Sequence, residues 1–139
     1  MRIAVAFLLM GLAATAAQDA EQFSGRLSVL PVDFSTYQRL SGSGEVQAAL
    51  SGRLLDVSGG FKGLSSSATA AHVHQAPPGR RGPPVFTIEV TEAHDGRLTG
   101  QVDLNGEQVE ALRAGELYVQ IHTENNPEGE IRGWLASVW

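Results

Sequence analysis

The 139-residue chain contains no cysteine, which excludes disulfide bonds, thiolate metal ligands and cysteine nucleophiles. Lysine is also nearly absent, since Lys62 is the only one in the sequence. The 10 lysine and arginine residues are outnumbered by 15 acidic residues, so the formal net charge is −5. Because a nucleic-acid groove needs a concentration of basic residues, we expect no nucleic-acid partner.

Long hydrophobic runs are absent apart from one at the N-terminus, where residues 3–12 are almost entirely apolar. Arg2 precedes this run, and the small residues 13–17 follow it. This order is typical of a cleaved secretory signal peptide, and the run is too short for a transmembrane helix. We therefore expect residues 1–17 to be removed. Residues 18–139 are then expected to form one β-domain, periplasmic or secreted, with no membrane anchor.

Helical periodicity is nearly absent after the signal peptide, whereas alternation of apolar and polar residues is common. This alternation, with turn signals about every 8–12 residues, predicts an all-β protein. The expected architecture is an antiparallel Greek-key or immunoglobulin-like sandwich, or a barrel, of about seven or eight strands. The expected strands cover 22–29, 44–50, 54–57, 67–74, 85–90, 98–104, 117–122 and 131–138.

Local signals set several boundaries within this pattern. Gly59-Gly60 is expected to end the third strand, and Asp95-Gly96 predicts a hairpin between the fifth and sixth. One short helix is expected over 107–114, with Asn105 as its N-cap and Gly115 after its end.

Histidines are the strongest candidates for chemistry in this chain. His72 and His74 lie two residues apart on an expected strand, so their side chains share a face with Cα atoms about 6.5–7 Å apart. His122 ends another expected strand, and if the two strands are neighbours the three imidazoles can surround one metal ion. Imidazole suits copper and zinc. The structural alternative is partly exposed histidines bonded to loop backbone, and His94, at the expected hairpin tip, is interpreted as a surface residue.

Charged residues accompany these histidines in two segments. Glu130 and Arg132 lie two residues apart near the last expected strand, where an ion pair would orient His122 or a bound anion. The alternative is a solvated salt bridge. Arg80 and Arg81 lie in a Pro- and Gly-rich loop, where two guanidinium groups would steer anions towards a metal or simply keep the loop soluble.

Taken together, several segments resemble the CHRD (chordin-type) domain family over roughly residues 22–136. The similarity is carried by a His-x-His strand, a Tyr-Val-x-Ile-His-Thr strand and an Asn-Pro-x-Gly-Glu-Ile-Arg-Gly turn. One departure is Gln120, where the family often has Asn. The resemblance implies an exported immunoglobulin-like or Greek-key β-domain, of the kind that recurs in chordin and often stands alone in bacteria. The segments are 70–74, 84–86, 115–123 and 126–133.

A weaker likeness connects His72, His74, His122 and Arg132 to copper/zinc superoxide dismutase. That family also has a strand His-Val-His pair, a later histidine and a Gly-rich turn carrying an arginine. Its full pattern includes a bridging histidine, an aspartate zinc ligand and a disulfide, and this chain has no cysteine and no histidine soon after His74. The likeness therefore implies a copper site more than a zinc site.

Two functions are consistent with these features. The first is an exported metal-binding β-domain, with copper favoured, that handles metal or performs simple redox chemistry on a small anion. The second is a non-catalytic module that binds an exported protein partner, with structural histidines and an apolar surface to which Trp134 or Trp139 contributes. Enzyme activity stays open, because a hydrolase or isomerase using His72 or His122 as base has no evident nucleophile or partner acid.

Overall fold

The computed structural model describes residues 20–30 and 33–138. The expected signal peptide and Trp139 lie outside the described residues. Nine strands and one helix are assigned. They are β1 (Glu21–Val29), β2 (Ser43–Ser51), β3 (Leu54–Lys62), β4 (Ala68–Gln75), β5 (Pro84–Val90), β6 (Gly96–Asp103), α1 (Gly106–Arg113), β7 (Leu117–Thr123), β8 (Ile131–Trp134) and β9 (Ala136–Ser137).

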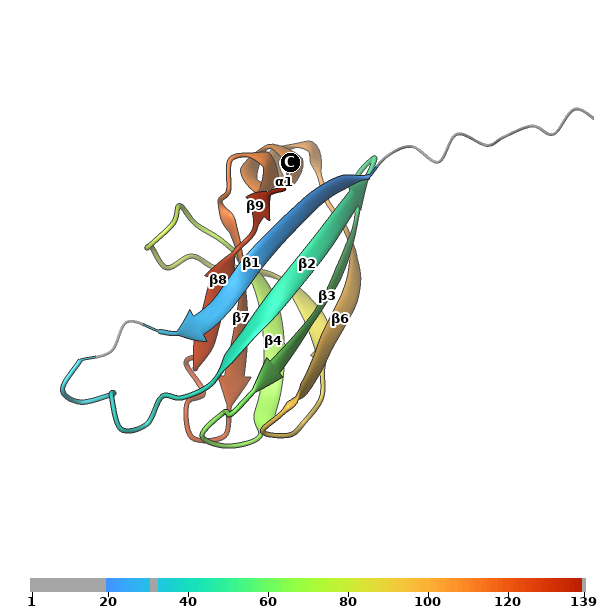
Figure 1. Ribbon diagram of the computed structural model, residues 1–139. Helices are drawn as coiled ribbons and strands as arrows, with labels where there is room; N and C mark the ends of the chain where they lie inside the picture. The colour runs from blue at the N-terminus through green and yellow to red at the C-terminus, as the bar shows by residue number, and fades with distance from the viewer. Residues whose placement is uncertain (1–19, 31–32, 139) are drawn as a thin grey trace, which may run out of the picture.

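Strands β1 to β8 form a closed antiparallel barrel (Figure 1). The neighbours run in the order β2-β3-β6-β5-β4-β7-β8-β1, and β1 pairs with β2 to close the ring. Strands β4, β5 and β6 are joined as consecutive antiparallel neighbours and β3 returns beside β6, which is a Greek-key arrangement. The expected all-β, antiparallel class is confirmed, and of the two architectures considered the barrel is the one observed.

The barrel interior is filled by the apolar residues of each alternating strand. Val119 and Ile121 of β7 are fully buried there, as are Ala71 and Val73 of β4. Side chains on a strand alternate between faces, so the residues between them point outwards. The outer face of β4 and β7 therefore carries the polar and aromatic residues of these strands, and the histidines lie outside the barrel core.

One expected strand end is wrong, because β3 runs through Gly59-Gly60 and ends at Lys62. A Cβ atom on Gly59 would lie 2.3 Å from the carbonyl oxygen of Glu45 on β2. Glycine is needed here for close approach of the two backbones within the sheet, which is one of its roles inside strands. The last expected strand, 131–138, is divided into β8 and β9 by the buried Leu135.

The expected helix is confirmed as α1, with the expected caps. The Asn105 side chain accepts a hydrogen bond from the backbone N–H of Gln108, and the Gln108 side chain accepts one from the backbone N–H of Asn105. Gly115 follows with a φ of 74°, a left-handed conformation that favours glycine. No helix in the described part of the chain has the length and apolar character needed to cross a membrane.

Candidate metal centre

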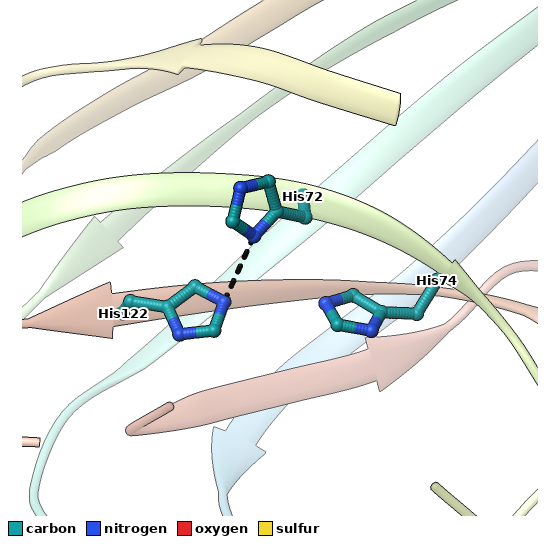
Figure 2. A group of neighbouring side chains, drawn as sticks. All are labelled: His72, His74 and His122. Atoms are coloured by element: carbon teal, nitrogen blue, oxygen red, sulfur yellow. Dashed lines mark hydrogen bonds between the residues drawn. The ribbon is translucent and has the colours of Figure 1, made fainter. Parts of the chain in front are cut away.

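The three histidines lie together on the outer face of the neighbouring strands β4 and β7 (Figure 2). The register places His72 opposite Gln120 and His74 opposite Tyr118, while His122 lies opposite Ala70. His72 and His74 therefore follow one another along β4, and His122 lies diagonally across from His72. The two strands are therefore neighbours, which is the condition that the sequence left open, and the three side chains lie near one another.

Their ring nitrogens are close enough to face a common point. His72 Nδ1 lies 3.0 Å from His122 Nε2, and one nitrogen from each of the three rings lies within 4.8 Å of the others. Figure 2 shows the ring of His74 pointing into the same space from the side. Two donors of one ion at bond lengths of about 2 Å are at most about 4 Å apart. A shift of at most about 1 Å would bring the widest pair into range.

Two backbone carbonyls determine which nitrogens remain available. His74 Nδ1 is 3.0 Å from the carbonyl oxygen of Gly82, and His122 Nδ1 is 2.8 Å from that of Pro127. A carbonyl only accepts, so each of these nitrogens must carry the hydrogen. In the neutral rings the Nε2 atoms of His74 and His122 are then unprotonated, and each carries a lone pair. Metal-binding histidines are commonly oriented by such a bond from the other ring nitrogen.

One nitrogen is left without any partner. His74 Nε2 is the only fully buried side-chain nitrogen or oxygen in residues 20–30 and 33–138 that forms no hydrogen bond. His74 as a whole is 7% exposed. A buried polar atom without a hydrogen bond costs about 1–3 kcal/mol, so such atoms are rare and call for an explanation.

The surroundings of His72 and His74 disfavour the charged form of each ring. Burial lowers the pKa of His72 below its ordinary value, and the neighbouring His122 and His74 lower it further. Burial also lowers the pKa of His74, and the nearby His122 and Arg132 act in the same direction, against the hydrogen bond to Gly82. Neutral imidazole is the form that binds metal ions.

The loop 76–83 is fixed to the site at Gly82. The backbone N–H of Gly82 donates to the Tyr118 hydroxyl at 3.1 Å, while its carbonyl holds His74. The Tyr118 ring stacks on His74 with centroids 4.7 Å apart. Trp134 lies against the Tyr118 ring, with centroids 4.8 Å apart, and its indole N–H donates to the Ala76 carbonyl. The loop and the aromatic rings together limit the positions that His74 can take.

Glu130 is placed differently from the ion pair considered above. It is 0% exposed and accepts hydrogen bonds from the Ser65 backbone and hydroxyl, the Thr123 hydroxyl and the Asn126 amide. Within the described residues it forms no salt bridge with Arg132. Residues two apart share a face only within a strand, and β8 begins at Ile131, so Glu130 lies before the strand that contains Arg132. Glu130 thus fixes the turn that presents the Pro127 carbonyl to His122.

The three arginines named from the sequence lie at different depths. Arg132 is buried on the outer face of β8, and Arg80 and Arg81 are exposed in the loop 76–83. Arg81 is near enough for its charge to lower the pKa of Arg132, although burial of Arg132 is the larger cause.

Several residues of the site were not identified from the sequence. Tyr118 entered the sequence analysis only as part of the Tyr-Val-x-Ile-His-Thr motif, with no role of its own. Gly82 belongs to no motif, and the Pro127 carbonyl is a backbone group that any residue offers. The alternation of Tyr118, Gln120 and His122 was a usable signal, because it places all three on one face of β7. Trp134 lies on this outer face rather than in the barrel core. His94 is exposed at the hairpin tip, as expected, with Nδ1 2.9 Å from the Leu64 carbonyl.

Comparison with known proteins gives one match. The family model described as the CHRD domain matches residues 22–135, which include all eight barrel strands apart from the first residue of β1, and all three histidines. No curated protein and no solved structure matches the chain.

Proposed function

The chain belongs to the CHRD domain family, and from its three converging histidines we propose that it binds one transition-metal ion outside the cytoplasm, with copper the favoured metal. The observation that carries the proposal is the buried, unpartnered Nε2 of His74, directed towards His72 and His122. A bound cation would remove the cost of leaving this lone pair without a partner.

The ligand atoms follow from the hydrogen bonds of the site. His74 and His122 would bind through Nε2, since their Nδ1 atoms donate to carbonyls. His72 would bind through Nδ1, the nitrogen that faces His122. In the metal-free protein this nitrogen donates to His122 Nε2, so metal binding requires only the other neutral tautomer of His72.

The donor set favours copper over harder ions. It consists of three imidazole nitrogens with no carboxylate, and magnesium, calcium and manganese prefer oxygen ligands. Divalent copper has the highest affinity of the first-row ions for such nitrogen sites, and zinc comes after it. A copper ion held by three protein ligands would supply one-electron chemistry at its open positions, or would simply be carried by the protein.

Titration of the purified full-length chain with Cu(II), followed by calorimetry and electron paramagnetic resonance, tests the proposal. We expect one ion per chain and nitrogen hyperfine structure from several imidazoles. His72→Ala, His74→Ala and His122→Ala should each weaken binding by at least about tenfold. His94→Ala is the matched control, because His94 is exposed and lies on a different hairpin. Unchanged binding in all three site variants would refute the metal site.

Export is part of the same proposal and rests on the N-terminal sequence. Mass spectrometry of the protein recovered from the extracytoplasmic fraction should show loss of about the first 17 residues. Recovery of the intact chain from the cytoplasm alone would contradict it.

An interaction module is the second candidate, and exposed aromatic residues favour it. In the loop after β1, Phe34 is 99% exposed and Tyr37 is 56% exposed. Exposed aromatic side chains are frequent at protein interfaces. This reading predicts no metal stoichiometry, together with a loss of stability for each histidine variant.

A further inference from the structure

Arg132 is a buried cation that the proposed metal site does not use. It is 7% exposed, and its guanidinium carbon lies 5.1 Å from the ring centroid of Trp134 and 5.8 Å from that of Tyr118. Within the described ranges it makes no salt bridge and its side chain makes no hydrogen bond. Among the protein groups around it, only two aromatic faces therefore compensate its charge.

This arrangement leaves hydrogen-bonding capacity unused. A guanidinium group has five N–H donors, and cation–π packing engages none of them. Buried charges are normally paired, because removing them from water is costly. The acidic residue nearest in sequence, Glu130, is hydrogen-bonded to Ser65, Thr123 and Asn126.

The charges around Arg132 are of the same sign or neutral. Arg81, on the loop 76–83, contributes a second positive charge, and the neighbour across the sheet on β7 is the neutral Gln120. Gln120 in turn lies opposite His72, so the guanidinium borders the histidine group along one row of the sheet. In a chain with a net charge of −5, this is a local concentration of positive charge.

The guanidinium group also remains reachable. Only His74 Nε2 is both fully buried and unpartnered among the described side chains. The nitrogens of Arg132 also have no hydrogen-bond partner, yet none of them is fully buried. They therefore keep some contact with solvent. A small ion can therefore approach them from outside the barrel.

We propose that Arg132, assisted by Arg81, binds a small planar oxyanion such as bicarbonate or a carboxylate beside the histidine group. The flat fork of N–H donors matches two oxygens of one anion, which is the usual geometry of arginine with a carboxylate. The site needs no metal ion, because both positive groups belong to the chain. With a metal bound, the anion would lie at the border of the metal site and give it a preference for anionic ligands.

The test is a titration of the metal-free full-length protein with sodium bicarbonate or acetate at constant ionic strength. The Arg132 Nε–H and Trp134 Nε1–H resonances are followed by NMR, with chloride as the comparison anion. We expect saturable shifts with the planar oxyanions and weaker, non-saturating shifts with chloride. Arg132→Gln should raise the apparent dissociation constant at least about tenfold, and Arg81→Gln by a smaller factor.

Two variants separate this result from a structural effect. Arg132→Lys keeps the charge and loses the fork, so it should still bind but more weakly. Arg97→Gln, an exposed arginine on β6, should bind as the parent protein does. Absence of saturable shifts, or equal affinity in the parent and in Arg132→Gln and Arg132→Lys, would overturn the proposal. Because no metal is added, this titration tests the anion site even if the protein does not bind copper.

Discussion

Gly82 lies where the loop 76–83 returns to β4, and replacing it with alanine perturbs the site without removing a metal ligand. A Cβ atom at this position would lie 1.8 Å from the carbonyl oxygen of Gln75 and 2.6 Å from its carbon. Ordinary contacts are above 3.4 Å, so the backbone of Gly82 has to move by more than 1 Å. Both backbone groups of Gly82 are used, one by His74 and one by Tyr118, and the movement breaks or lengthens both bonds.

The expected magnitude follows from the loss of one orienting hydrogen bond on a ligand. Changes to such bonds typically cost about 10–100-fold in metal affinity, which corresponds to about 1.4–2.7 kcal/mol. The loop is exposed at positions 77–81, so we expect the barrel to keep its fold. Copper affinity by calorimetry is the first readout. The second is the ¹⁵N chemical shift of His74 in the metal-free protein, which reports whether Nδ1 still carries the hydrogen.

Gly106→Ala is the matched control, because a Cβ atom there would meet nothing within 4 Å. It should leave both copper affinity and the His74 tautomer unchanged. If Gly82→Ala binds copper with the affinity of the parent protein while its melting curve shows a folded barrel, the orienting role of the Gly82 carbonyl is refuted.

Two further predictions concern stability. Burial lowers the pKa of His72 and His74 below 6.5, so the folded state binds fewer protons than the unfolded state just below that pH. The metal-free protein should therefore be most stable above about pH 6.5 and lose stability as the pH falls, and chemical denaturation should show a smaller loss in His74→Phe. Glu130→Ala removes the acceptor of four hydrogen bonds and should lower the free energy of unfolding by about 3–5 kcal/mol. Glu128→Ala, at an exposed position in the same turn, is the control and should lower it by less than about 0.5 kcal/mol. Equal denaturation midpoints for these two glutamate variants would contradict the role given to Glu130.

Much of the fold was predictable because its signals are local. Alternation, β-rich composition and turn signals located β1 to β7 and predicted β8 and β9 as a single strand, and the capping residues Asn105 and Gly115 located the helix. The error at Gly59-Gly60 has a physical cause. Glycine ends a strand or allows two strands to approach, and only the position of Glu45 on β2 distinguishes the two cases.

The sequence predicted the candidate ligands of the site but not the groups that orient them. The two-residue spacing of His72 and His74 is enough to place them on one face, whatever the rest of the chain does. The ion pair between Glu130 and Arg132 was wrong because the strand starts one residue too late for the alternation to apply. Glu130 instead turns inwards, and Arg132 packs on Trp134 and Tyr118.

The strand-rich class, the absence of thiol chemistry and the shared face of the His-x-His pair follow from the residues alone, because each depends on residue type and on neighbours within a few positions. The position of β7 beside β4, which brings His122 to His72, follows only from the tertiary structure. The carbonyl oxygens of Gly82 and Pro127, which belong to two different loops, accept hydrogen bonds from Nδ1 of His74 and His122 and so leave the Nε2 atoms unprotonated. These features depend on segments up to 50 residues apart, and pairing between such distant segments is decided by the whole barrel rather than by any local pattern.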